Sequence, residues 1–184
     1  MKQQTRQLNP ERRDRILNTA QALFVLHGLR GTSMEAIARE AGVAKPTLYA
    51  YFADKDLVFK TLARRIFEEW QALVALELSG PGPAQERIAR ALTAKLKAYF
   101  RLISVSPHAA ELYGEKSKLL AEPLEALEKW LEEEFTSALV AEGHKDARRH
   151  VQVLLACAEG LAARARYIEE IGPAARLVVS KLLS

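Results

Sequence analysis

The sequence contains one cysteine, Cys157, and four scattered histidines in 184 residues. A single cysteine can form neither a disulfide within the chain nor a cysteine-based zinc site. The two histidines closest in sequence, His144 and His150, are six residues apart, a spacing that does not stack two imidazoles on one helix face. We therefore expect no metal site and no cofactor, and reducing, cytoplasmic surroundings.

Long apolar runs and phosphate-binding glycine patterns are also missing. No run approaches the roughly 18 apolar residues that cross a bilayer, and the first ten residues lack the apolar block of a secretion signal. Neither GxGxxG nor GxxxxGK[ST] occurs. The glutamates at 128 and 132–134 fit a solvated helical face. Nothing in the sequence indicates an enzyme or a membrane protein.

The positive charge is concentrated at the N-terminal end. Residues 1–55 hold nine basic and five acidic residues, whereas the remaining chain holds 18 of each. A basic surface supplies sequence-independent affinity for nucleic-acid phosphates. The polar residues 1–10, with Lys2 and Arg6, are either a solvated end or an arm that touches DNA, and both readings stay open.

Residues 32–55 predict two short helices joined by a tight turn. Thr32 is suited to cap the first helix, with Glu35 completing a capping box. Gly42 marks the turn, because a residue just past a helix end often adopts a left-handed conformation. In the second helix, Leu48 and Phe52 lie four residues apart and share a buried side. This is the helix-turn-helix plan, whose second helix enters the major groove of DNA.

Roughly residues 11–59 resemble the TetR/AcrR family of transcriptional regulators. The positions that carry the resemblance are Gly28, Thr32, Ile37, Ala38, Ala41, Gly42, Val43, Thr47, Leu48, Tyr49, Tyr51, Phe52, Lys55 and Leu57. Two positions depart from the usual family pattern: Ala44 stands where Ser is common, and Pro46 where Gly is common. The resemblance implies a DNA-binding domain followed by a variable domain that binds an effector and dimerises.

No strand pattern occurs, and helical periodicity continues to the C-terminus. We predict an all-α fold of about nine helices, with a three-helix domain at residues 1–53 and a helical bundle at residues 54–184. Residues 54–78 form a connecting helix that ends at the Gly- and Pro-rich residues 79–83. Further helices are expected at residues 84–104, 122–142, 146–170 and 173–183, with a short segment at 108–113 and a stop at Gly172.

The predicted DNA-binding residues lie on the two short helices and at the start of the connecting helix. They are Thr32, Ser33, Lys45, Pro46, Thr47, Tyr49, Ala50, Tyr51 and Lys55. We expect Lys45, Thr47 and Ala50 to contact base edges. Thr32, Ser33 and the two tyrosines are expected to contact phosphates; for the tyrosines the alternative is that their rings pack as support. The first turn of the connecting helix, at Lys55, is expected to be a phosphate site, with a solvated lysine as the alternative.

The resemblance implies that a small hydrophobic or aromatic effector enters a cavity among the middle helices and moves the connecting helix. The protein then releases its operator, which we expect to be near-palindromic. Polar-tipped aromatic and neighbouring side chains are the candidates for its walls. They are Trp70, Tyr99, Phe100, Ile103, His108, Tyr113, Trp130, Cys157 and Tyr167.

The last two helices are predicted to form the homodimer interface, as the resemblance implies. Ala156, Gly160 and Ala163 are small residues at helical spacing that allow close approach of another helix. Leu177 and Val178 make the terminal helix too apolar to stay exposed. Packing within one chain is the alternative for these residues. For the whole chain, the alternative is a helix-turn-helix protein whose C-terminal domain only dimerises or binds a protein, without an effector.

Overall fold

A computed structural model describes residues 9–106, 108–109 and 118–183. Within these residues the chain forms eight helices and no strand, which confirms the all-α prediction. The helices are α1 (Pro10–Gly31), α2 (Met34–Glu40), α3 (Lys45–Tyr51), α4 (Lys55–Leu78), α5 (Ala84–Ser104), α7 (Ala121–Val140), α8 (Ala147–Arg164) and α9 (Ile168–Leu182). Most of the segment expected at 108–113 lies outside the described residues.

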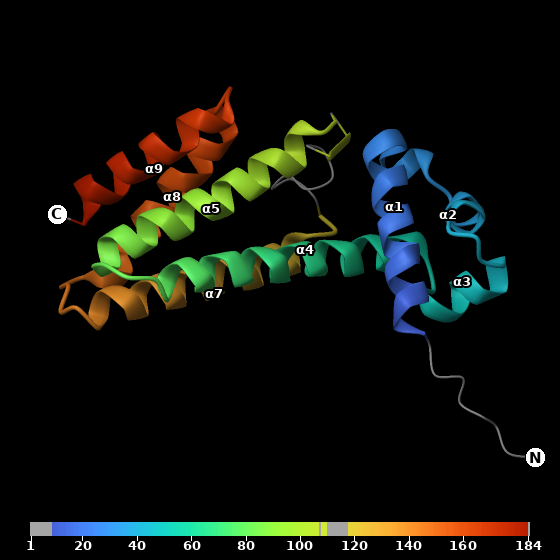
Figure 1. The fold of residues 1–184 in the computed structure, drawn as a ribbon, viewed down its shortest axis with the longest axis horizontal. Helices are drawn as coiled ribbons and strands as arrows, with labels where there is room; N and C mark the ends of the chain where they lie inside the picture. The colour runs from blue at the N-terminus through green and yellow to red at the C-terminus, as the bar shows by residue number, and fades with distance from the viewer. Residues whose placement is uncertain (1–8, 107, 110–117, 184) are drawn as a thin grey trace, which may run out of the picture.

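Helices α1–α3 lie at one end of an elongated molecule, and α5, α7, α8 and α9 form a bundle at the other (Figure 1). Helix α4 links the two, because it packs on α1 near its start and on α5 and α7 further along. Its N-cap is Asp54, as expected: Oδ1 accepts a hydrogen bond from the Leu57 N–H at 2.7 Å. A displacement of α4 therefore reaches both ends of the molecule.

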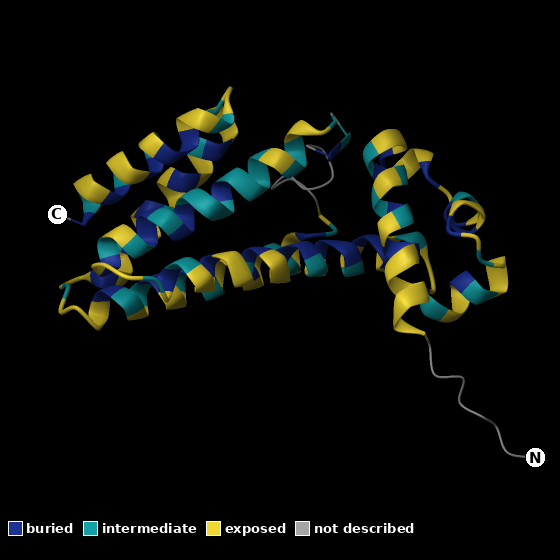
Figure 2. Ribbon diagram, viewed as in Figure 1, coloured by how far each residue is buried: buried dark blue, intermediate teal, exposed yellow. Residues whose placement is uncertain are grey.

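The apolar side of α1 packs against α4 and α2. Phe24 of α1 and Phe59 of α4 are both fully buried and meet edge to face, with ring centroids 5.8 Å apart. Figure 2 shows buried segments along α4 where it approaches α1. Ile37 of α2 and Leu48 of α3 are also fully buried. Burial of each such side chain contributes about 1.5–3 kcal/mol relative to exposure.

A glutamate from a distant loop stabilises the α4–α5 turn. Pro83, the N-cap of α5, provides no side-chain cap. Instead Glu142 Oε1 accepts hydrogen bonds from the Ala84 N–H at 2.7 Å and from Arg87 Nη2 at 2.9 Å. Arg87 Nη1 also donates to the Leu78 carbonyl at 2.8 Å. The bond from the Ala84 N–H, followed by the contact with Arg87, lowers the pKa of Glu142.

The predicted stop at Gly172 is wrong. Helix α8 ends at Arg164 and α9 begins at Ile168, so Gly172 and Pro173 lie inside α9. The break comes earlier because Glu170 Oε2 accepts hydrogen bonds from the Arg166 and Tyr167 N–H groups, at 2.9 and 3.4 Å, and so caps the new helix. Gly172 is buried, and a Cβ there would lie 3.5 Å from Thr93 Cγ2 of α5. That distance is an ordinary van der Waals contact, so Gly172 packs against α5 as an interior residue of α9.

Candidate nucleic-acid interface

The start of α2 is capped by Ser33, and not by Thr32 as the capping-box pattern predicted. Ser33 Oγ accepts a hydrogen bond from the Ala36 N–H at 3.1 Å. Thr32 is only 2% exposed, and its hydroxyl donates to the Gly28 carbonyl at 2.8 Å, with the Leu23 carbonyl at 3.2 Å. The hydroxyl thus closes the last turn of α1, where Gly28 has a φ of 70°. Thr32 is therefore withdrawn as a phosphate-binding side chain.

The turn between α2 and α3 has the geometry expected around Gly42. The Val43 N–H donates to the Ala38 carbonyl at 3.0 Å, and the Gly42 N–H donates to the Arg39 carbonyl at 3.1 Å. With a φ of 63° at Gly42, these two bonds form a Schellman motif, which satisfies carbonyls at the end of α2. The turn sets the direction in which α3 leaves.

Helix α3 presents one side to solvent and buries the other. Leu48 is fully buried, and Phe52, just past the helix, is 2% exposed. The Leu48 and Phe52 positions match the predicted buried side. The exposed residues of α3 are Lys45, Pro46, Tyr49 and Ala50, while Thr47 and Tyr51 are half-buried. The outer surface of α3 is thus available to a large partner.

Lys45 is held between two neighbouring side chains on this surface. Its ammonium forms an ion pair with the Glu35 carboxylate of α2 and lies 6.0 Å from the centre of the Tyr49 ring. The hydrogen bond between the two side chains raises the pKa of Lys45 and lowers the pKa of Glu35. The sequence motif did not reveal Glu35 as a partner of Lys45, because the contact arises only when the two helices are placed together.

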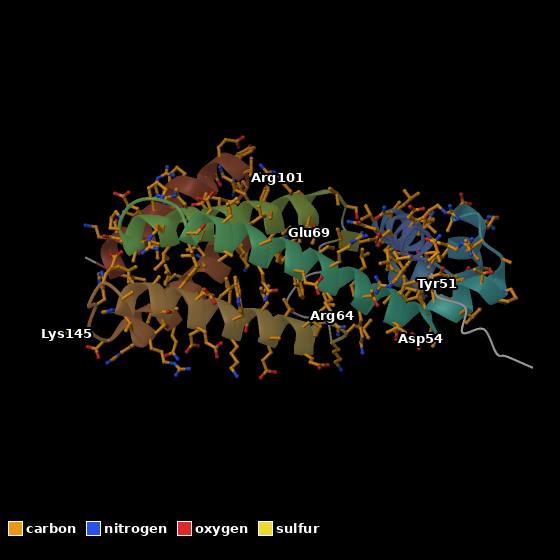
Figure 3. All side chains as sticks on the ribbon, turned by 60° about the horizontal axis from the view of Figure 1, so that its bottom comes forward. Tyr51, Asp54, Arg64, Glu69, Arg101 and Lys145 are labelled. Carbon is orange, nitrogen blue, oxygen red and sulfur yellow. The ribbon has the colours of Figure 1, made fainter. Side chains whose placement is uncertain are left out.

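The predicted phosphate role of Tyr51 is not supported by its contacts. The hydroxyl accepts a hydrogen bond from the Asn9 N–H at 2.9 Å, and lies 3.3 Å from the Asn9 carbonyl, to which it donates. Asn9 is the N-cap of α1. Tyr51 therefore ties the end of α3 to the start of α1, beside the beginning of α4 marked by Asp54 (Figure 3).

Lys55 has a similar internal role. Its ammonium donates to the Thr32 carbonyl at 2.7 Å, so the first residue of α4 is joined to the connection before α2. The predicted phosphate site is also altered by Asp54, whose carboxylate caps the same turn of α4. An anion would have to approach beside that carboxylate. In this structure Lys55 supports the start of α2, and its predicted phosphate contact stays a prediction.

Two arginines that the sequence pattern did not single out support the same surface. Arg15 Nε donates to the Ala41 carbonyl at the end of α2, at 3.0 Å. The Arg13 guanidinium lies 5.7 Å from the centre of the Phe52 ring. Both contacts cross from α1 to later elements, so no local sequence signal identifies them.

A half-open cavity of about 460 Å³ lies among the middle helices, between α4, α5, α7 and α8. Trp70 of α4 and Tyr99 of α5 both line it, as predicted, and their rings meet edge to face at 6.1 Å. Leucines from α5, α7 and α8 complete the apolar walls, and charged residues, including Lys95 and Glu128, lie around them. The volume falls in the range of small-molecule sites.

Most of the other predicted cavity residues lie elsewhere. Phe100, Ile103 and Trp130 pack half-buried against the core and are not among the residues that line this cavity. Cys157 is exposed and Tyr167 is 66% exposed, and neither is among the residues that line this cavity. These predictions were drawn from aromatic character and apolar neighbours, which do not indicate the face of the helix. Tyr113 lies outside the described residues.

His108 belongs to the contact between the bundle and α1. A Cβ at Gly28 would lie 3.1 Å from His108 Nδ1, so the imidazole is placed against the end of α1. Beside it, Ser106 Oγ donates to the Val25 carbonyl of α1 at 2.7 Å and accepts from the Ala109 N–H at 3.0 Å. The prediction that His108 lines the cavity is therefore replaced by a role between the two ends of the molecule.

The outer faces of α8 and α9 are largely uncovered (Figure 2). The predicted interface residues Ala156, Gly160 and Ala163 are exposed, Leu177 is 59% exposed, and Val178 is half-buried. Ala156 also contributes to the cavity wall. A groove between the helices contains Cys157, Gly160 and Val178. Small and apolar residues without cover are typical of a surface that another chain buries.

Among the described residues, no helix is both long and apolar enough to cross a membrane.

Comparisons with known proteins agree with this arrangement. Residues 16–62 match the family model described as bacterial regulatory proteins, tetR family. The regulator HbdR of Aromatoleum is 31% identical over 84 residues, which cover 46% of this chain and 37% of HbdR. EthR of Mycobacterium tuberculosis is 38% identical over 69 residues, which cover 38% of this chain and 31% of EthR. The match thus spans less than half the length of these curated relatives.

Similarity over the whole chain comes from solved structures. A TetR/AcrR regulator from Thermobifida fusca superposes with a TM-score of 0.70 at 25% identity, covering 92% of this chain and 97% of that one. Residues 16–62 are therefore similar in sequence to the tetR family of bacterial regulatory proteins, and 92% of the chain is similar in fold to a TetR/AcrR regulator.

Proposed function

We propose that the chain is a DNA-binding transcriptional regulator that acts as a homodimer and releases its operator when a small molecule fills the bundle cavity. The observation that carries the proposal is the geometry of α3. Leu48 and Phe52 fix its inner side, while Lys45, Tyr49 and Ala50 remain exposed. Residues 1–53 would form the reading unit and residues 54–184 the sensing and dimerising unit.

Within this proposal, the residues of α3 and Ser33 at the start of α2 have different roles in DNA binding. Lys45 donates to a guanine edge, and the methyl groups of Thr47 and Ala50 meet thymine methyls. Pro46 starts the helix, and Tyr49 and Ser33 contact phosphates, which position the protein without reading sequence. Two such helices, related by a twofold axis, fit successive major grooves of a near-palindromic operator.

The route from cavity to DNA runs through two connections. Trp70, at the cavity wall, lies on α4, whose first half packs on α1. Ser106 joins the end of α5 to α1 through the Val25 carbonyl. An effector that prefers one position of α4 and α5 would shift the separation of the reading units, whereas a ligand with equal affinity for both positions would shift nothing. We propose that the bound protein represses transcription, so that release from the operator allows expression.

Fluorescence anisotropy with a DNA library tests the reading surface. We expect the wild-type protein to select a near-palindromic duplex, and Lys45→Ala and Thr47→Ala each to weaken binding to it by about 1–3 kcal/mol. The same variants should bind a scrambled duplex with a smaller change. Selection of no sequence by the wild-type protein would contradict the proposal.

A thermal-shift screen tests the sensing part separately. Apolar and aromatic metabolites that bind the cavity should raise the melting temperature and lower affinity for the selected duplex. Ligands that stabilise the fold but leave DNA binding unchanged would favour the simpler reading, in which the bundle only dimerises or binds a protein.

A further inference from the structure

The Glu35–Lys45 ion pair lies on the surface assigned to DNA, and a carboxylate is unfavourable beside phosphates. Glu35 is in the first turn of α2 and Lys45 is the first residue of α3, so the pair bridges the two helices that flank the turn. Both side chains are more than half exposed, at 56% and 54%. The pair is therefore open to competition from an arriving partner.

We propose that Glu35 is a specificity-determining residue. It holds the Lys45 ammonium away from phosphates, and the ammonium leaves Glu35 only to donate a hydrogen bond to the correct base edge. This inference rests on the proposed function, because it concerns how the same surface selects DNA. Glu35 acts through Lys45 and is thus a positioning residue.

The charge balance of the pair gives the first part of the argument. Binding to DNA of arbitrary sequence depends on cations that neutralise phosphates and release counterions. An ammonium already paired with a carboxylate adds no net charge, so Lys45 contributes little to such binding. Affinity for arbitrary DNA is kept low, and the ratio of specific to non-specific affinity rises.

The neighbours of the Lys45 ammonium also restrict the conformation of this side chain. Glu35 lies on α2, and the Tyr49 ring on α3 lies 6.0 Å from the Lys45 nitrogen. Two neighbours on different helices restrict a side chain that otherwise samples many rotamers. A restricted lysine loses less conformational entropy when it meets a base edge. The specific contact is therefore favoured by the same pair that suppresses the non-specific one.

The pair is well suited to mutation because exposed ion pairs contribute little to folding. Glu35→Gln removes the charge and keeps the shape of the side chain. Glu40→Gln is a matched control, since it removes one carboxylate from the same helix. Glu40 pairs with its neighbour Arg39 within α2, and that contact does not reach α3.

The experiment measures anisotropy for the full chain with two duplexes, one selected by the wild-type protein from a random library and one scrambled, over a series of KCl concentrations. For Glu35→Gln we expect the scrambled duplex to bind about five- to tenfold more tightly at 0.1 M salt, with a slope of log K against log salt that is more negative by about 0.9. Binding to the selected duplex should change less, so the specificity ratio falls. The double variant Glu35→Gln/Lys45→Gln should restore the wild-type slope, and Glu40→Gln should retain both the slope and the ratio.

Three outcomes would overturn the inference. An unchanged slope and ratio in Glu35→Gln would show that the pair does not control Lys45. Equal effects of Glu40→Gln and Glu35→Gln would show that the change in DNA affinity comes from the loss of one negative charge on α2, whatever its position. Loss of the selected duplex alone would mean that Glu35 itself reads a base. If the wild-type protein fails to discriminate between the two duplexes, the proposed function fails; if it discriminates and only the Glu35 effect is missing, this inference alone fails.

Discussion

Single hydrogen bonds in this protein connect segments that the sequence pattern treats as separate. Thr32 is the clearest case, because its buried hydroxyl serves the end of α1 and not the start of α2. The Tyr51 hydroxyl and the Lys55 ammonium likewise bind backbone atoms of other elements. These three contacts join α1, α3, α4 and the connection before α2 to one another, and so fix the position of α3.

Replacement of Thr32 separates this structural role from a DNA-contact role. Thr32→Val keeps the side-chain shape but removes the donor for the Gly28 carbonyl, and we expect a loss of about 1–3 kcal/mol in the free energy of unfolding. Thr32→Ser keeps the hydroxyl and is the matched control, with a smaller loss. Urea denaturation measures both. Equal stability of the valine variant and the wild-type protein would contradict the role assigned to this hydroxyl.

The same residue shows what sequence can and cannot predict at this scale. The pattern of Thr32 and Glu35 fits a capping box, yet Ser33, one residue later, has the capping geometry. Both residues are good caps, and the choice depends on the Gly28 carbonyl, which only the folded α1 brings near. Leu48, Phe52 and Gly42 were predicted correctly because their roles follow from local periodicity and backbone preference.

At the scale of whole helices, sequence predicted the elements that have local boundary signals. Helix α4 begins after the capping residue Asp54 and ends before the glycines and prolines at 79–83, and α5 runs from Ala84 to Ser104 as expected. The boundary between α8 and α9 was misplaced because Gly172 was read as a stop, whereas it lies buried inside α9 and contacts α5. Helix-to-helix contacts of this kind leave no signal within one segment.

The N-terminus of α5 gives a prediction for pH. The Ala84 N–H and Arg87 lower the pKa of Glu142, so its carboxylate stabilises the fold above the ordinary glutamate pKa of about 4.3. This contribution is lost as the pH falls from that value through the lowered pKa of the folded state. We expect Glu142→Gln to lower the melting temperature at pH 7. Below pH 4 the difference in melting temperature between the variant and the wild-type protein should become progressively smaller.

Glu133→Gln is the control for this measurement, because Glu133 forms only a long contact of 4.0 Å with Lys129. Its melting temperature should follow that of the wild-type protein at every pH. If Glu142→Gln lowers the melting temperature by the same amount at acidic pH as at pH 7, the lost stability comes from packing and not from the charge.

The whole molecule separates a reading end from a bundle end, with α4 between them (Figure 1). Dimerisation through α8 and α9 would place the twofold axis at the bundle, far from α3, so that small changes in helix tilt become changes in the separation of the two reading surfaces. The sequence predicted an interface of small and apolar residues on the last two helices. It did not show that Cys157, like those residues, is exposed on α8. Burial along a helix depends on which side its neighbours cover.

Leu177→Glu tests this assembly. Leu177 is 59% exposed on α9, and a carboxylate buried there in a dimer would lack a partner. We therefore expect the variant to be a monomer in sedimentation velocity. Its affinity for the selected duplex should fall by about 100-fold or more, because the two reading units are no longer linked. Leu76→Glu is the matched control, because Leu76 is 68% exposed on α4, outside the proposed interface. It should remain a dimer with unchanged DNA affinity. A Leu177→Glu protein that stays dimeric would move the interface elsewhere, whereas a monomer with full affinity would show that one reading unit suffices and that the operator need not be palindromic.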